Sequence, residues 1–182
     1  MMEVEVKVRI IEEDIERKIE EFGAAFVGFE DHTDTYYNTP YRDFSETDEA
    51  LRIRCTEAEG SEITSILTYK GAKVDEDSKT RKEVEVRIED ARKMDEILSL
   101  LGFSKAGNVI KKRRNYRMDE ISIVLDDVEH LGRFIELEMT SEDEDFKLQK
   151  EKIFKILKEL GFDKTEVIRE SYLELLHKVI SE

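Results

Sequence analysis

Charged and aliphatic residues alternate along several segments of this chain, beginning almost at its first residue. Residues 3–10, EVEVKVRI, set Glu3, Glu5, Lys7 and Arg9 against four aliphatic side chains. Successive side chains on a strand point to opposite faces, so this alternation predicts a strand with one charged and one aliphatic face. Similar alternation predicts further strands at 51–54, 62–71, 80–88, 109–118 and 134–139. A mostly apolar run predicts one at 121–128, and a segment rich in Thr and Tyr predicts one at 33–39.

Between these segments, apolar residues recur about every 3.6 positions, which predicts helices that bury one face. Three such helices are expected over 15–22, 91–101 and 146–160, each followed at once by a glycine that favours a helix end. The acidic segment SEDED (141–145) favours the start of the third helix. A last helix is expected over 166–180.

Together these elements predict an α+β fold in one domain, 1–182. If the strands form one sheet with the helices outside, the aliphatic faces meet the helices and the charged faces become concave. If that sheet curled into a barrel, the charged faces would enclose a tunnel. The alternative is an open sheet whose charged face lies in water, with its charges paired across neighbouring strands.

Composition narrows the class of protein. Hydrophobic residues make up 39% and charged residues 41% of the 182 residues, which is typical of a globular, water-soluble chain. The net charge of −15 counts against a general nucleic-acid binder or an anionic-membrane binder, so any bound polyanion must enter a local basic pocket. No apolar run approaches a membrane span, no signal peptide precedes the first strand, and Cys55 is the single cysteine. These features favour a cytoplasmic location.

The charged strand faces carry two sets of functional groups. The acidic groups suit hard divalent cations such as Mg²⁺ or Mn²⁺, and they are Glu3, Glu5, Glu83, Glu85, Asp126, Glu136 and Glu138. The basic groups suit phosphate oxygens, and they are Lys7, Arg52, Arg54, Lys70, Arg81, Lys111 and Arg113. A metal combined with cationic side chains is typical of phosphoryl or nucleotidyl transfer, where much of the catalysis is the stabilisation of negative charge.

The order of several motifs resembles a known superfamily. The motifs are Glu3-x-Glu5-x-Lys7, DTYYNTP, LRIR, TYKG, TRKEVEV, KKRR, LDDVEHLGRFIELE and ESYLELL, and they span essentially the whole chain. In this order the sequence resembles the CYTH superfamily, the triphosphate tunnel metalloenzymes. DTYYNTP, LDDVEHLGRFIELE and SYLELL make it most similar to the class IV adenylyl cyclase (CyaB-like) branch.

The resemblance implies a single domain, an eight-stranded antiparallel closed barrel with helices packed outside. Its tunnel would bind a nucleoside triphosphate or inorganic triphosphate with Mg²⁺ or Mn²⁺. It implies metal-side carboxylates at Glu3, Glu5, Asp126, Glu136 and Glu138. It implies phosphate contacts from Lys7, Arg52, Arg54, Lys70, Arg81, Lys111 and Arg113. The catalytic positions would be Glu3, Glu5, Lys7, Arg113 and Glu136, while Glu83 and Glu85 could serve a second metal site or act as charge partners.

Two reactions use such a site. A cyclase would convert ATP to cyclic AMP and pyrophosphate, whereas an inorganic or organic triphosphatase would hydrolyse the terminal phosphate. A non-catalytic module that binds polyphosphate or a nucleotide is the third alternative. Of these we expect the cyclase first, and the resemblance also makes a homodimer plausible.

Other conspicuous residues receive structural interpretations. His32, His130 and His177 show no paired spacing that would indicate zinc. We expect Tyr172 to pack its helix onto the barrel, and we expect Ser171 near the tunnel mouth.

Overall fold

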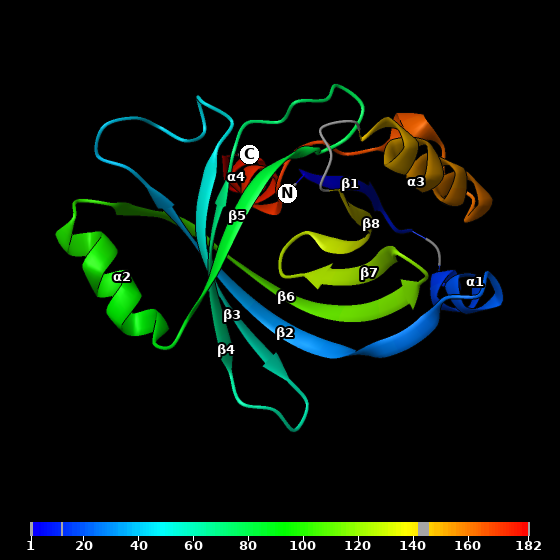
Figure 1. Ribbon diagram of the computed structural model, residues 1–182, viewed down its shortest axis with the longest axis horizontal. Helices are drawn as coiled ribbons and strands as arrows, with labels where there is room; N and C mark the ends of the chain where they lie inside the picture. The colour runs from blue at the N-terminus through cyan, green and yellow to red at the C-terminus, as the bar shows by residue number, and fades with distance from the viewer. Residues whose placement is uncertain (1, 12, 142–145, 182) are drawn as a thin grey trace.

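The computed structural model describes residues 2–11, 13–141 and 146–181, and its central feature is a closed antiparallel barrel of eight strands (Figure 1). Neighbouring strands follow the order β1-β5-β4-β3-β2-β6-β7-β8, and β8 closes the ring by pairing with β1. The predicted fold class is therefore confirmed. The strands are β1 (Met2–Arg9), β2 (Ala25–Asn38), β3 (Ala50–Ala58), β4 (Thr64–Lys70), β5 (Arg81–Ile88), β6 (Ser104–Met118), β7 (Ile121–Val128) and β8 (Gly132–Ser141).

The helices lie outside this barrel, as predicted. They are α1 (Ile15–Glu21), α2 (Ala91–Leu100), α3 (Lys147–Glu159), the 3₁₀ turn η1 (Lys164–Glu166) and α4 (Tyr172–Ser181). In Figure 1, α1 and α3 flank one side of the barrel and α2 flanks the other. The acidic residues 142–145, expected to favour the start of α3, lie outside the described residues.

The last helix begins later than the sequence predicts. It was expected from residue 166, but η1 ends there and extended backbone follows. The amide of Ile168 donates a hydrogen bond to the carbonyl of Lys7 at 2.7 Å, so this segment is held against β1. Helix α4 then starts where Ser171 and Glu174 cap it reciprocally, with side chain to backbone distances of 3.2 and 2.6 Å. Local capping therefore decides the boundary that apolar periodicity alone misplaces.

Gly23 and Gly102 end their helices by the mechanism expected of glycine. Their φ angles are +103° and +89°, in the left-handed region that residues with a Cβ avoid. After each glycine, the next amide donates to a carbonyl five residues back, from Ala24 to Ile19 and from Phe103 to Leu98.

Strand β1 shows how the alternating pattern divides the molecule into an outer and an inner layer. Val4, Val6 and Val8 are fully buried beneath α1 and α3, in a cluster that includes Ile15 and Ile153. The charged residues Glu3, Glu5 and Lys7, which alternate with these valines, lie on the inner side of the strand. The main apolar core therefore lies between the barrel and its outer helices, and a charged layer lies inside the barrel.

Strand β6 follows the same rule. Lys111 and Arg113 are buried and face inward, whereas Lys112 is exposed and Arg114 approaches Glu16 of α1 at 3.5 Å. The register places Arg113 between Glu30 on β2 and Asp126 on β7. Among the described residues, no helix has both the length and the apolarity needed to cross a membrane.

Truncating the outer core should destabilise the fold much more than truncating the surface. Leu137 of β8 is fully buried, whereas Leu148 of α3 is 60% exposed. We expect Leu137→Ala to lower the free energy of unfolding by about 2–5 kcal/mol, because it removes buried contacts and leaves a cavity. The matched change Leu148→Ala should alter it by no more than about 0.5 kcal/mol. Urea unfolding of the two variants checks this, and equal losses would contradict the assigned layers.

Candidate active site

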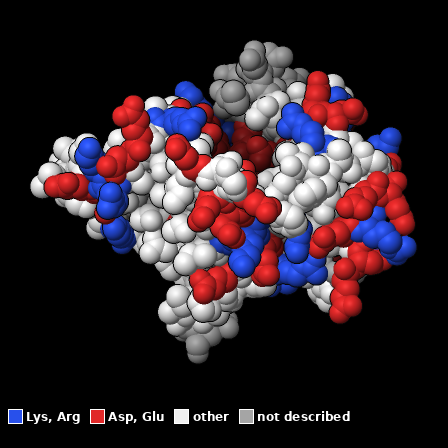
Figure 2. Space-filling model, turned by 90° about the horizontal axis from the view of Figure 1, so that it is seen from below, with Lys and Arg blue, Asp and Glu red and all other residues white. Residues whose placement is uncertain are grey.

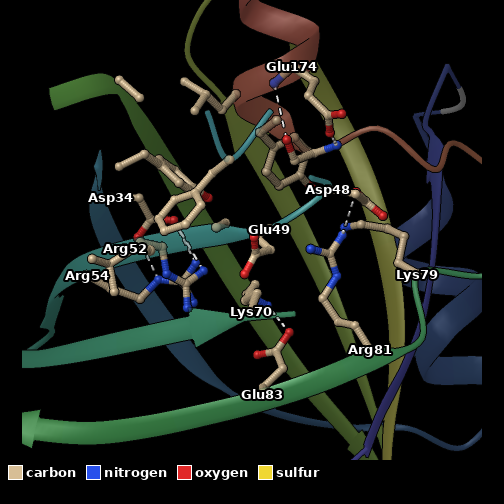
Figure 3. A pocket seen from close by; sticks show the side chains of 18 of the residues that line it. Asp34, Asp48, Glu49, Arg52, Arg54, Lys70, Lys79, Arg81, Glu83 and Glu174 are labelled. Carbon is tan, nitrogen blue, oxygen red and sulfur yellow. Dashed lines mark hydrogen bonds and ion pairs between the residues drawn. The ribbon is translucent and has the colours of Figure 1, made fainter. Parts of the chain in front are cut away.

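The barrel encloses a cavity of about 530 Å³, a size common for small-molecule sites. Its walls come from strands on opposite sides of the barrel, from the segment before β5 and from the start of α4 (Figure 3). In the space-filling view, acidic side chains are visible inside a hollow (Figure 2). Most of the residues selected from the sequence line this cavity, namely Glu3, Glu5, Arg52, Arg54, Lys70, Arg81, Glu83, Glu85, Lys111, Arg113, Glu136 and Glu138.

Lys7 and Asp126 do not line the cavity but lie buried behind its wall. The Lys7 ammonium donates to the carbonyl of Glu170 and lies 4.1 Å from the centre of the Tyr172 ring. Burial, together with the nearby Lys79 cation, lowers the pKa of Lys7 to about 7. Lys7 therefore holds the segment that leads into α4.

Asp126 sits at the centre of a buried hydrogen-bond network. Its two oxygens accept a bidentate pair from Arg113, both at 2.6 Å. One oxygen also accepts from Lys111 at 2.9 Å and from the Tyr172 hydroxyl at 3.0 Å. Because its acceptor positions are engaged by these donors, Asp126 orients the cations of β6 toward the cavity.

The cations of β3 are held by Asp34, a residue that the sequence analysis did not assign. Arg54 binds Asp34 through two bonds of 2.7 Å, and Arg52 approaches the same carboxylate at 3.8 Å. Burial by itself would raise the pKa of Asp34, but the charges of Arg52 and Arg54 hold this pKa well below its usual range. Within the described part of the chain, the buried Nε of Arg52 has no hydrogen-bond partner. Such a donor calls for an acceptor from a ligand or water.

The Lys70 ammonium, from β4, lies between carboxylates of β1 and β5. It is paired with Glu83 and lies 3.2 Å from Glu3 (Figure 3). Burial and the nearby Glu3 carboxylate raise the pKa of Glu83 to about 8. Glu83 contacts Lys70 here, and the two roles that the sequence left open, second metal site and charge partner, stay predictions. Glu85 is half exposed, and it accepts a hydrogen bond from Thr68 at 2.9 Å.

The carboxylates of β1 and β8 converge on Lys79, a cation that the sequence analysis missed. The Lys79 ammonium donates to Glu5 and lies 3.7 Å from Glu136, while Arg113 donates to the other oxygen of Glu136 at 2.8 Å. Burial, with the charges of Glu3 and Glu5, raises the pKa of the nearby Glu138 well above its usual range. Acidic side chains are therefore concentrated at this end of the cavity, where a cation would reduce their mutual repulsion.

The residue types fit a cation, although a complete ligand shell is not preformed. Within the described residues, no three His, Cys, Asp or Glu side chains are grouped closely enough to hold a metal. Mg²⁺ is nevertheless commonly bound by one or two carboxylates together with phosphate oxygens and waters. Glu5 and Glu136 face one cation already, so they are the pair that best suits this mode of binding.

Lys79 and Asp34 could have been found from sequence signals. Lys79 continues the alternation of Arg81, Glu83 and Glu85 by one step toward the N-terminus. Asp34 opens the DTYYNTP segment, where it alternates with Tyr36. Tyr36 and Ser171 both line the cavity, and the Tyr172 ring packs against Phe134 with ring centres 5.1 Å apart.

A closed barrel whose charged interior surrounds a cavity defines the tunnel class of ligand-binding protein, and the comparisons identify the family. The CYTH domain model matches residues 1–172. A Methanocaldococcus jannaschii protein named "Putative adenylate cyclase MJ0240" is 43% identical over 177 residues, covering 96% of this chain and 98% of that relative. The chain therefore belongs to the CYTH domain family.

Solved structures show the same architecture. The PH1819 protein from Pyrococcus horikoshii OT3 matches with a TM-score of 0.90 and 45% identity, over 97% of this chain and 99% of that chain. HpAC1 from Hippeastrum, described as a "putative adenylyl cyclase" with a dominant triphosphatase activity, matches with a TM-score of 0.64 over 97% of this chain and 96% of that one. At 19% identity, this second match shows a shared fold alone.

Removing the charge of Asp126 should destabilise the protein far more than removing the charge of its neighbour Asp127. Asp126→Asn leaves the buried Arg113 and Lys111 without their shared carboxylate, so we expect a loss of about 3–5 kcal/mol in the free energy of unfolding. Asp127→Asn, at an exposed position of the same strand, should cost less than about 1 kcal/mol. Urea unfolding measures both, and a small loss for Asp126→Asn would show that the network is not structural.

Acidification should weaken the fold through His32. This residue is buried, its Nε2 lies 2.9 Å from Glu30, and burial lowers its pKa from 6.5 to about 4. Below pH 6.5 the unfolded chain takes up a proton that the folded chain does not, so stability falls as the pH drops.

The His32→Gln variant isolates this contribution. Between pH 6.5 and about 5, wild-type protein should lose free energy of unfolding relative to His32→Gln, measured by urea unfolding at each pH. His130→Gln, which alters an exposed turn, should retain the wild-type slope. Parallel curves for wild type and His32→Gln would contradict the assignment.

Proposed function

We propose that this protein is a divalent-metal-dependent enzyme that converts ATP to cyclic AMP and pyrophosphate. The observation that carries the proposal is the convergence of arginine, lysine and carboxylate side chains from seven strands on one cavity. The name of the M. jannaschii relative, which is 43% identical, favours the cyclase reaction.

The cationic wall supports binding of a triphosphate. In the proposal, the phosphate oxygens are bound by Arg52, Arg54, Lys70, Arg81, Lys111 and Arg113, with Lys7 behind them. The buried Nε of Arg52, which has no partner in the described part of the chain, is an unused donor in this wall. The bidentate contacts with Asp34 and Asp126 fix the planes of Arg54 and Arg113 before a ligand arrives.

The acidic wall supports a divalent cation. Acidic side chains outnumber Lys and Arg among the residues that line the cavity, so a triphosphate entering alone would meet net repulsion. In the proposal, Glu5 and Glu136 hold Mg²⁺ or Mn²⁺, with Glu3 and Glu138 beside them. When bound, the metal would neutralise phosphate charge and stabilise the pyrophosphate leaving group. Asp126 contributes by positioning Arg113 and Lys111.

The remaining wall favours a nucleotide over a bare inorganic triphosphate. Tyr36, Phe44, Ala50 and Leu173 line the cavity next to its charged section, and they offer apolar and aromatic surface to a base or ribose. In the cyclase reaction, the ribose 3′-hydroxyl attacks the α-phosphorus and pyrophosphate leaves. In a triphosphatase, water would attack the terminal phosphorus instead, so the two activities differ in which phosphorus lies in line with a nucleophile.

Product analysis tests the proposed reaction. Purified protein is incubated with ATP or tripolyphosphate in the presence of Mg²⁺ or Mn²⁺, and the products are resolved by chromatography. Cyclic AMP together with pyrophosphate is the expected result. Orthophosphate release from either substrate would replace the cyclase with a triphosphatase, and tight binding without turnover would show a binding module.

The variant Glu5→Gln tests the assigned site. It keeps the size of the side chain but removes the charge proposed to hold the metal, so kcat/KM should fall on the order of 10²–10³-fold. Glu96→Gln, at an exposed position of α2, should turn over normally. Circular dichroism melting confirms that both variants fold. Normal turnover by folded Glu5→Gln would show that the cavity is not the catalytic site as assigned.

A further inference from the structure

The segment 71–80 joins β4 to β5 and runs along the open part of the seam between β5 and β1. The two strands pair only at Met2 with Lys82 and at Glu3 with Arg81. Beyond that point the amide of Lys79 donates to the carbonyl of Glu5 at 2.9 Å, so the segment extends the contact with β1. In Figure 1 it arches from β4 past β1 toward α3 before β5 begins. We call residues 71–80 the strap.

The strap delivers one buried cation into the cavity. Lys79 is 8% exposed, and its neighbours Ser78 and Thr80 are fully buried. The Lys79 ammonium donates to Glu5 and lies 3.7 Å from Glu136. A single positive charge therefore occupies the space between the two carboxylates that best suit a divalent cation.

The strap is fastened on its outer side, away from the cavity. Lys150 of α3 pairs with Asp75 at 2.6 Å and with Asp77 at 2.9 Å. Lys164 of η1 pairs with Asp77 at 2.8 Å, and Arg169 donates to the carbonyl of Asp75 at 2.8 Å. The backbone of the strap is thus fixed independently of the Lys79 side chain, whose four-carbon stem can swing without the strap moving.

Competition follows from this geometry. A divalent cation at Glu5 and Glu136 would lie within a few ångströms of the Lys79 ammonium, and like charges repel strongly at that distance in a buried site. The ammonium then needs another anionic partner to stay buried. A triphosphate in the same cavity would supply that anionic partner, because Lys79 and the proposed phosphate ligand Arg81 both line the cavity.

We propose that Lys79 is a built-in counter-ion that holds Glu5 and Glu136 in the metal-free protein, is displaced by the divalent cation, and then pairs with the bound triphosphate. This inference rests on the proposed function, since it takes Glu5 and Glu136 as the metal-binding pair. Lys79 is a positioning residue for the carboxylates before the metal enters and a phosphate contact afterwards. Binding of metal and of triphosphate therefore favour one another.

Mn²⁺ titration followed by electron paramagnetic resonance tests the proposal without any turnover. Free Mn²⁺ is measured with wild type and with Lys79→Met, first without triphosphate and then with a methylene-bridged ATP analogue, and the Mn²⁺ bound by the analogue alone is subtracted. Without triphosphate, Lys79→Met should bind Mn²⁺ about tenfold more tightly, because no ammonium competes for the carboxylates. The strengthening of Mn²⁺ binding by the analogue should be smaller in Lys79→Met than in wild type.

Lys82→Met is the matched control, because Lys82 is exposed on β5 three residues along the chain. Lys82→Met should bind Mn²⁺ with the wild-type affinity. If both variants bind Mn²⁺ equally more tightly than wild type, the loss of one positive charge anywhere nearby explains the change, and the proposal is overturned. An unchanged Mn²⁺ affinity in folded Lys79→Met also overturns it. If melting shows that Lys79→Met does not fold, the uncharged polar variant Lys79→Gln takes its place in the same titration.

The titration separates this inference from the proposed function. Wild type that binds no Mn²⁺, even with the analogue present, would overturn the metal assignment itself. Wild type that binds Mn²⁺ with the same affinity as Lys79→Met and Lys79→Gln would leave that assignment standing and remove only the role of Lys79.

Discussion

The whole structure depends on enclosing opposite charges in the middle of a closed barrel. Asp126 and Glu136 share the guanidinium of Arg113 through bonds of 2.6 to 2.8 Å, and all three side chains are buried. Buried charges of this kind are tolerated only when each has partners with good geometry, because desolvation is costly. Strands with strictly alternating faces, closed into a ring, bring such partners together from distant parts of the sequence.

This arrangement places the apolar core and the charged cavity in different layers of the molecule. The inside of the barrel cannot act as the main apolar core, so the aliphatic strand faces are buried outward, where α1 and α3 cover Val4, Val6 and Val8. The helices stabilise the fold by burying that face. The cavity side chains, by contrast, are preorganised by mutual pairing, as Arg54 is by Asp34.

Much of the fold and part of the site could be predicted from local sequence. Alternation with period two placed Glu3 and Glu5 on one face and the valines of β1 on the other, and it marked β3, β4, β5, β6 and β8. By contrast, β7 was indicated by an apolar run, and only the second half of β2 was indicated, by its Thr and Tyr content. Glycines after periodic helices, such as Gly23, marked helix ends because only glycine readily adopts the left-handed conformation found there. Motif order supplied the remaining family information, since a charge pattern on one strand is not specific by itself.

What the sequence by itself determined is which side chains share a face, because that follows from backbone geometry within one strand or helix. Which residues reach the cavity was decided by the tertiary structure. Lys7 alternates correctly, yet the segment before α4 covers it, and Asp126 is enclosed by Arg113, Lys111 and Tyr172. Lys79 reaches Glu5 from a segment with no regular structure. Depth and partnership depend on barrel closure and on contacts between residues far apart in the chain, which local patterns do not encode.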